Sequence, residues 1–156
     1  MLAKLGPHHR AKLASLLAQT PEFTRAEVDV ALELVDAALA DPSADDYRFV
    51  VAEDGETVLG YACFGSTPMT EGCFDLYWLV VGQAARRLGV GRELMAAVEG
   101  VLRDEGARIV RVETAGLESY AAARAFYERV GYGISGRIRD FYWRGNDLFI
   151  YTKYLD

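Results

Sequence analysis

The stretch Arg86-Arg87-Leu88-Gly89-Val90-Gly91 has the composition of an anion-binding turn. It follows an apolar segment typical of a buried strand and opens a segment with helical periodicity. Two glycines let the backbone approach an anion closely, and the first amides of a helix have no intrahelical partner. The sequence therefore predicts a phosphate site here. A tight strand-to-helix turn with two surface arginines is the alternative interpretation.

Two other nucleotide-binding motifs do not fit the same letters. A dinucleotide fingerprint requires a third glycine, and Leu94 stands at that position. A P-loop requires Gly-Lys-Ser/Thr, and Gly91 is followed by Arg92 and Glu93. The turn is therefore neither of these motifs.

Two acidic residues lie in the predicted strands before and after this turn. Asp75 lies inside the apolar run 74–81, where an acid needs a structural or chemical explanation. It is a candidate general base, and the alternative is an ion pair or hydrogen bond with a neighbouring Arg or Tyr. Glu113, at the end of the next predicted strand, is a second candidate, either as a base or as an anchor for an ammonium group.

These residues must be positioned by a sheet and its helices. Helices are predicted after Pro7, after a Thr24–Glu27 capping box, and over 90–105 and 120–130. Strands are predicted over residues 2–5, 48–53, 57–65, 74–81, 108–114, 132–139 and 148–154. This order predicts an α/β fold with a mixed (α+β) sheet of about seven strands and helices on both faces. The length of 156 residues fits one domain over residues 1–156.

Two segments resemble motifs of the GNAT N-acetyltransferase superfamily. Residues 81–91 (Val-Gly-Gln-Ala-Ala-Arg-Arg-Leu-Gly-Val-Gly) are similar to its signature of Gln or Arg, two residues, Gly, one residue, and Gly or Ala. Residues 123–132 (Ala-Arg-Ala-Phe-Tyr-Glu-Arg-Val-Gly-Tyr) are similar to its second motif, a helix with an aromatic pair that ends in Gly and an aromatic residue. With the order of elements, the resemblance covers nearly the whole chain.

The resemblance implies acetyl-CoA as the cosubstrate and no metal. The backbone amides of the first motif would bind the pyrophosphate, and the central strand would pair with the pantetheine arm. The positions that match the family's cofactor site are Leu79, Val81, Arg86, Arg87, Leu88, Gly89, Val90, Gly91, Arg92, Tyr120, Ala123 and Arg124. Tyr120 stands where the family often has Asn.

The resemblance also implies direct transfer of an acetyl group to a primary amine in a ternary complex. Such an amine, with a pKa of ~10.4 in water, must lose a proton before it attacks. An acid that matches Asp75 is the base in histone-acetylating members, whereas Glu113 rests on geometry alone and water is the third option. Tyr127 matches the tyrosine that protonates the leaving thiolate; its alternative role is packing. A backbone N–H near Leu79 would stabilise the oxyanion.

The composition restricts the partners. A formal net charge of -6 argues against a nucleic-acid partner, which needs a basic surface. No apolar run is long enough to span a membrane, and the first ten residues do not read as a signal peptide, so a cytoplasmic location is expected. The expected partner is a small-molecule or peptide amine. Cys63 and Cys73 are interpreted as small apolar residues.

Three alternatives remain open. The aromatic and charged segment 140–147 is expected to be a loop that closes over the acceptor or, equally, an aromatic-bearing surface loop or a homodimer contact. A chain of this kind would alternatively be a non-catalytic acetyl-CoA-binding or sensing module, or would transfer a different acyl group. His8 and His9, near the N-terminus, are expected to be exposed to solvent.

Overall fold

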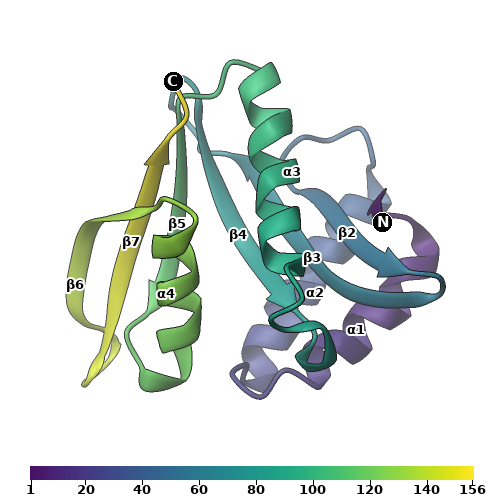
Figure 1. Cartoon of the computed structure of the whole chain (residues 1–156), viewed down its shortest axis with the longest axis horizontal. Coiled ribbons are helices and arrows are strands. Elements are labelled where there is room, and N and C mark those ends of the chain that lie inside the picture. Colours follow the sequence, from purple (N-terminus) through teal and green to yellow (C-terminus); the bar gives the residue numbers. More distant parts are fainter.

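The computed structural model describes all 156 residues (Figure 1). Its helices are α1 (Arg10–Ala18), α2 (Arg25–Ala40), α3 (Val90–Asp104) and α4 (Ala121–Arg129), with 3₁₀ turns η1 (Pro7–His9), η2 (Gln83–Ala85) and η3 (Glu118–Tyr120). Its strands are β1 (Leu2–Lys4), β2 (Arg48–Asp54), β3 (Thr57–Ser66), β4 (Cys73–Val81), β5 (Ile109–Ala115), β6 (Gly133–Trp143) and β7 (Asn146–Tyr154).

The strands form one sheet in the order β1-β2-β3-β4-β5-β7-β6. Every neighbouring pair is antiparallel except β4 and β5, which run parallel. The apolar strand β4 therefore lies at the centre of the sheet. The predicted mixed α/β fold of seven strands is confirmed.

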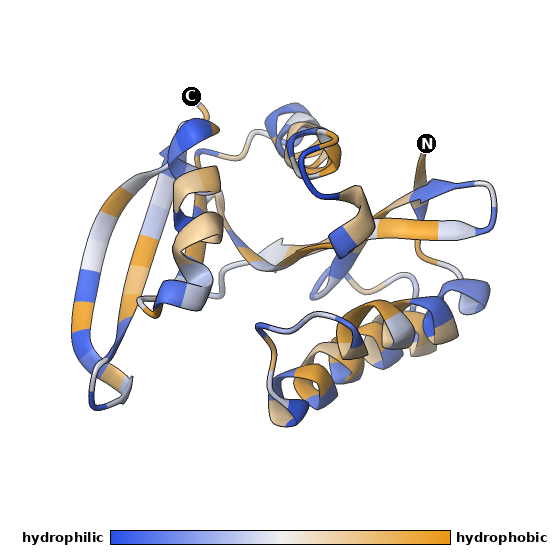
Figure 2. Ribbon diagram, turned by 60° about the horizontal axis from the view of Figure 1, so that its bottom comes forward, coloured by the Kyte–Doolittle hydropathy of each residue, from blue (hydrophilic) through white to orange (hydrophobic).

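Helices cover both faces of the sheet, as predicted. Figure 2 shows α1 and α2 as a layer on one side of β1 to β4, while α3 and α4 lie on the other side. The apolar face of α3 (Leu94, Val98 and others) packs into one core cluster, and Leu17 of α1 and Val35 of α2 belong to the other. No helix combines the length and the apolar composition needed to cross a bilayer.

The start of α2 is fixed by the predicted capping box. Thr24 accepts a hydrogen bond at Oγ1 from the backbone N–H of Glu27 (3.2 Å), and the Glu27 carboxylate faces the Thr24 N–H in return. Phe23, just before the cap, packs edge-on against Trp78 of β4, with 5.3 Å between ring centroids. The α1–α2 loop is therefore held against the central strand, where it can form part of a binding site.

The prediction that both N-terminal histidines are exposed is wrong for His9, whose exposed fraction is 0%. Its Nδ1 accepts a hydrogen bond from the backbone N–H of Gly6, so the neutral ring carries its proton on Nε2, which faces Glu53 Oε2 at 3.1 Å. Nitrogens of His8 and His9 and an oxygen of Glu53 lie within 4.8 Å of one another. Both nitrogens of His9 are already bonded, so this group fastens the N-terminal turn to β2.

The predicted loop over residues 140–147 is also wrong, because the hairpin continues into it. Strand β6 extends to Trp143 and β7 begins at Asn146, so only a two-residue turn remains. The Asp147 carboxylate accepts one hydrogen bond from Arg137 Nε (2.7 Å) and another from the backbone N–H of Asp140, in the irregular part of β6. These bonds let turn-forming residues sit inside strands.

Candidate active site

A cleft opens between β4 and β5 because the two strands pair over only part of their length. Cys73–Leu76 of β4 pairs with Ile109–Val112 of β5. Beyond these residues the strands diverge toward the start of α3, as Figure 1 shows. The backbone of β4 that faces β5 there has no strand partner and is available to a ligand.

A bulge at Tyr77 bends β4 at the point where the divergence begins. The residues on either side of Tyr77 pair with adjacent residues of β3, so Tyr77 itself is the extra residue. A bulge bends its strand and increases the local twist. It also shifts the alternation of side chains, so Leu76 and Leu79 both pack on the α3 side while Trp78 packs with α1 and α2.

The cleft has a volume of about 1530 Å³. Pockets for one small ligand are typically ~300–1,000 Å³, so this cleft has room for two ligands that react with each other. The α1–α2 loop, β4, the start of α3, β5, α4 and the β6–β7 hairpin all contribute to its walls. The polar and charged residues that line it include Glu22, Glu27, Asp75, Arg86, Arg87, Arg92, Arg111, Glu113, Tyr120, Tyr127, Arg129, Tyr142 and Asn146.

The N-terminus of α3 forms one end of the cleft. Gly89 caps the helix with φ of 85°, a left-handed conformation that glycine adopts without strain, and no side chain caps the helix. The amides of the first turn therefore have no partner within the protein. Arg87 and Arg92 line the same end, are exposed, and take part in no ion pair. Free amides, positive charge and the helix dipole together suit a pyrophosphate.

The second glycine of the turn has a different role. A Cβ on Gly91 would lie 3.3 Å from the ring of Phe126 and 3.6 Å from Val81 Cγ2, whereas a Cβ on Gly89 would meet nothing. Gly91 therefore allows α3 to approach α4 closely. Val90 between them points into the core and is 7% exposed.

Arg86 is committed to the α1–α2 loop. Its two terminal nitrogens donate to the two carboxylate oxygens of Glu22, at 2.9 Å and 3.2 Å. This bidentate pair lowers the pKa of the Glu22 carboxyl. The predicted cationic donor is present at the cleft, but its charge is already neutralised by a partner.

Tyr127 of α4 reaches the cleft with its hydroxyl unpaired. The residue is 7% exposed and lines the cleft, yet the hydroxyl makes no hydrogen bond within the protein. The rings of Phe126, Tyr132 and Tyr151 surround it, with centroids 5.7–6.0 Å away. This burial raises the pKa of the phenol, so it keeps its proton.

The candidate bases Asp75 and Glu113 lie on either side of Arg111. Asp75 is 8% exposed, and its Oδ1 accepts a hydrogen bond from Arg111 Nε at 2.6 Å. Glu113 Oε1 is 3.8 Å from Arg111 Nη1, and its side chain is half exposed. The hydrogen bond and charge of Asp75 raise the pKa of Arg111. All three residues line the cleft, so the sequence prediction that the two acids meet at one site agrees with this placement.

Tyr120 joins the two sides of the cleft. Its hydroxyl donates to Glu27 Oε2 at 2.9 Å and lies 3.4 Å from the backbone oxygen of Glu22. Burial and the Glu27 carboxylate raise the pKa of Tyr120. The residue that stands in place of the family's Asn therefore contacts the α1–α2 loop.

The comparison with protein families decides the assignment. The profile of the acetyltransferase (GNAT) family matches residues 11–132. The chain belongs to the GNAT acetyltransferase family. The resemblance inferred from the two motifs is confirmed, and no curated protein sequence matches the chain.

Solved structures of GNAT proteins share the whole fold. A crystal structure of a protein assigned to this family from Desulfovibrio desulfuricans is 38% identical, with a TM-score of 0.96 over 100% of this chain and 99% of that chain. An aminoglycoside 6'-N-acetyltransferase complexed with coenzyme A is 17% identical, with a TM-score of 0.78 over 100% and 97%. The ribosomal-protein-S18-alanine N-acetyltransferase from Escherichia coli is also 17% identical, with a TM-score of 0.78 over 100% and 94%. The last two show a common fold alone.

Two of the residues expected at the cofactor site, Arg124 and Leu88, do not line the cleft of this GNAT protein. Arg124 donates from Nη1 to the backbone oxygens of Ala115 and Leu117, at 2.7 Å and 2.8 Å, so it fastens α4 to the end of β5. Leu88 is 74% exposed and is absent from the wall of the cleft, whereas Ala123, one residue before Arg124, lines it. A motif fixes the position of a residue along the chain but not the direction of its side chain.

Sequence reasoning missed three residues of the GNAT cleft. Arg111 was not identified as the partner of Asp75, although its alternation with Glu113 places it on the same face of β5. Glu27 was interpreted only as a capping residue. Asn146, only 2% exposed, lines the cleft with its Oδ1 unbonded, and no sequence signal marked it.

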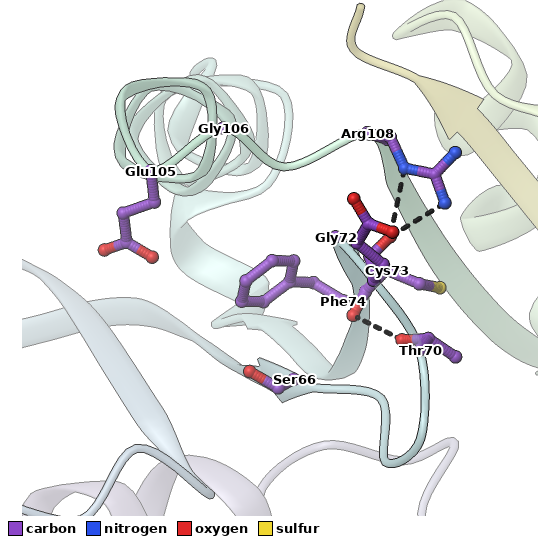
Figure 3. A pocket seen from close by; sticks show the side chains of 9 residues that line it. Ser66, Thr70, Gly72, Cys73, Phe74, Glu105, Gly106 and Arg108 are labelled. Atoms are coloured by element: carbon purple, nitrogen blue, oxygen red, sulfur yellow. Dashed lines mark hydrogen bonds between the residues drawn. The ribbon is translucent and has the colours of Figure 1, made fainter.

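A second, smaller pocket lies at the opposite end of β4, between the β3–β4 turn and the end of α3. Its volume is about 290 Å³. Figure 3 shows Arg108 at one edge of the pocket, where the guanidinium donates to the backbone oxygen of Glu71 at 3.0 Å and 2.8 Å. The only arginine of this pocket is thus used to close the turn, and the pocket is separate from the GNAT cleft.

Proposed function

We propose that this chain transfers an acetyl group from acetyl-CoA to a primary amine, directly and within a ternary complex. Membership of the GNAT acetyltransferase family supports the reaction class. The observation that carries the proposal is the unbonded hydroxyl of Tyr127, held in a cleft that ends at the free amides of α3. Coenzyme A in the aminoglycoside 6'-N-acetyltransferase of the same fold gives independent support for the cosubstrate.

The two ends of the cleft divide the binding work. The free amides of α3, with Arg87 and Arg92, bind the pyrophosphate through charge-assisted hydrogen bonds. The unpaired edge of β4, including Leu79 and Val81, pairs with the amide groups of the pantetheine arm. This arrangement brings the thioester to the point where β4 and β5 separate.

The chemical step needs one base and one acid. The deprotonated amine nitrogen attacks the thioester carbonyl carbon, and a C–N bond forms as the C–S bond breaks. A backbone N–H of β4 near Leu79 stabilises the oxyanion of the tetrahedral intermediate. Tyr127 gives its proton to the departing sulfur, and the high pKa of the buried phenol means that it arrives at this step protonated.

Asp75 is the first choice for the base. Its Oδ1 is held by Arg111, and its Oδ2 has no hydrogen bond within the protein, so one oxygen is fixed and the other is available. An ammonium proton leaves to Oδ2 directly or through a water molecule. Glu113 is the alternative, because it lines the same cleft and is less tightly paired.

A panel of primary amines tests this proposal. Acetyl-CoA and each amine are incubated with the protein, released thiol is measured, and the product mass is determined. The expected result is an amine gaining one acetyl group with an equal amount of CoA released. Binding of acetyl-CoA with no release for any amine would instead favour the sensing module, and preference for another acyl-CoA would change the donor.

A further inference from the structure

We propose that the acceptor end of the cleft binds a small amine that carries a second ammonium group, with Glu27 and Glu113 as the carboxylates that hold it. This inference rests on the proposed function, because it specifies the acceptor of that reaction.

The wall of the cleft carries both paired and unpaired charges. Two acids of the wall have arginine partners, Glu22 with Arg86 and Asp75 with Arg111, and each of these pairs is held by a hydrogen bond of 2.9 Å or less. After these pairs are removed, the wall keeps two acids and three arginines, which are Glu27, Glu113, Arg87, Arg92 and Arg129. Arg87 and Arg92 serve the pyrophosphate. Of the two remaining acids, Glu27 has no ion pair and Glu113 has only Arg111, at 3.8 Å.

Glu27, Glu113 and the aromatic side chain of Tyr142 line the same cleft. Tyr142, from β6, has its pKa raised by burial and then by the charges of Glu113 and Glu27 together. Both carboxylates therefore act on the same phenol, although they come from α2 and β5. An ammonium group placed beside Tyr142 would donate hydrogen bonds to the two carboxylates and contact the face of the aromatic ring.

Neither carboxylate is used up by other contacts. Glu27 accepts hydrogen bonds from Thr24 and Tyr120, which are both neutral groups, so its charge is not compensated. Glu113 has only Arg111 at 3.8 Å, and that arginine bonds Asp75 at 2.6 Å. A cationic ligand would compensate the negative charge of both carboxylates.

Asn146 provides an independent sign of a missing hydrogen-bond donor. The residue lines the cleft and is 2% exposed, yet its Oδ1 has no partner and the side chain makes no hydrogen bond at all. A buried amide oxygen without a donor is uncommon in folded proteins. An N–H group of a bound amine that reached this oxygen would satisfy it, whereas an alkyl or carboxylate group would not.

The same features disfavour other acceptors. Arg111, the cation beside both Asp75 and Glu113, is already shared by these two acids and is not free to bind a carboxylate group of the acceptor. The hydroxyl of Tyr120 links to Glu27 across the cleft, so the space beside it is bounded on two sides. A compact diamine or amino sugar fits this description better than an amino acid.

Matched acceptors test the inference. Acetylation is measured as CoA release for the diamines from diaminopropane to diaminohexane, for aminoalkanes of the same chain lengths, and for the corresponding ω-amino acids. The best diamine should exceed both of its matched compounds in kcat/KM by about tenfold or more, the usual effect of one charge-assisted hydrogen bond. An aminoalkane or ω-amino acid that equals the diamine would overturn the inference.

Two charge-removing variants identify the residues. Glu113→Gln changes a half-exposed side chain, and Glu27→Gln keeps the helix cap because glutamine also forms a capping box. Each should lower kcat/KM for the diamine about tenfold, and Glu27→Gln, which removes no candidate base, should leave the aminoalkane within about twofold. Glu56→Gln, in the exposed β2–β3 turn, is the matched control and should change neither. An unchanged diamine preference in both cleft variants would contradict the assignment.

A binding measurement separates this inference from the proposed function. Calorimetry of the diamine and the aminoalkane with the protein–CoA complex requires no turnover. Tighter binding of the diamine, lost in Glu113→Gln, supports the second ammonium site even if no acetyl transfer occurs. Equal binding of the two compounds overturns it, while CoA release from the aminoalkane would leave the transferase proposal intact.

Discussion

Buried tyrosines in this protein differ in whether their hydroxyls are bonded. Tyr132 donates to Glu99 and Tyr151 to Glu128, as expected for phenols in a core. Tyr127 lies between the same rings, and its hydroxyl has no partner. A phenol that faces a cleft without a partner is available to a ligand, which distinguishes this residue from its neighbours.

Tyr127→Phe should lower kcat by about 10²–10⁴ and leave the Kd of acetyl-CoA unchanged, because the proton is needed only as the thiolate leaves. Tyr127 acts as an acid only while it is protonated, and its raised pKa moves deprotonation to higher pH. Wild-type kcat should therefore show no decrease from this group as the pH rises to about 10, the ordinary pKa of tyrosine. Single-turnover rates and calorimetry give the two quantities. Full turnover in the variant would make Tyr127 a packing residue.

Asp75→Asn should lower kcat/KM and move its pH dependence toward that of the free amine, because the carboxylate that accepts the proton is lost. The shape of the side chain is kept, but the ion pair with Arg111 is not. Arg111→Gln is therefore the matched variant, since it breaks the same pair and keeps the carboxylate. Profiles of kcat/KM against pH are measured for all three proteins. Equal losses in both variants would assign a positioning role to the pair and leave Glu113 as the candidate base.

At this scale the sequence predicted single residues better than their partners. Tyr127 and Gly89 were placed by motif, and Asp75 by its conflict with an apolar strand. The contact of Asp75 with Arg111 depends on the register of two parallel strands that are far apart in sequence. The approach of Glu27 to Tyr120 depends on how two layers pack. Neither is encoded in local spacing.

Among the elements, α3 contributes both to the cleft, through its N-terminus, and to the packing of the fold, through a buried acid. Its N-terminus presents free amides to the cleft, and farther along it carries Glu99, an acid that is 5% exposed. Glu99 accepts hydrogen bonds from Lys153 Nζ (2.9 Å) and from the hydroxyl of Tyr132 (3.0 Å). The network fastens α3 to β7 and to the residues after α4, on the far side of the cleft.

Glu99→Ala should lower the free energy of unfolding by about 1–3 kcal/mol. The change leaves the Lys153 ammonium and the Tyr132 hydroxyl without their acceptor, although Lys153 keeps the backbone oxygen of Val130. Urea denaturation measures the effect. Glu93→Ala, exposed on the same helix, is the control and should change stability by less than about 0.5 kcal/mol. Similar losses in the two variants would show that the network adds little.

The order and type of the elements followed from the sequence, and one boundary did not. The Thr24–Glu27 box and the apolar pattern of α3 are strong local signals, and both helices begin where predicted. The segment 140–147 contains turn-forming residues, yet most of it belongs to strands, because Arg137 and the backbone N–H of Asp140 bond the Asp147 carboxylate. Tertiary bonds of this kind override local turn preference.

The whole molecule consists of two half-sheets that share a short seam. β1 to β4, with α1, α2 and α3, form one half, and β5 to β7, with α4, form the other. They meet through four residue pairs of β4 and β5, through the core cluster that α3 shares with β5, α4 and β7, through Glu99 with Lys153, and through Tyr120 with Glu27. A ligand in the cleft contacts both halves at once.

Acetyl-CoA should therefore raise the melting temperature, by an amount that grows with its concentration. A ligand that binds only the folded state adds ~2.7 kcal/mol at one hundred times its Kd. The double variant Arg87→Gln, Arg92→Gln should need about tenfold more ligand for the same shift, because it removes two unpaired cations from the pyrophosphate end. Its melting temperature without ligand should match the wild type.

Thermal scans at several acetyl-CoA concentrations measure this effect. Arg144→Gln, in the exposed β6–β7 turn, is the control and should behave as the wild type. An equal shift in the double variant would place the ligand away from α3. Equal weakening in the control would show a general effect of net charge.

The bulge at Tyr77 has a consequence for the evolution of this sheet. Removing that residue would restore the regular alternation of side chains along β4 and allow the strand to pair with β5 over its full length. The additional backbone pairing would favour the folded state, while the groove between the strands would disappear. One extra residue thus keeps β4 and β5 apart at a cost in stability, and selection for stability alone would remove it.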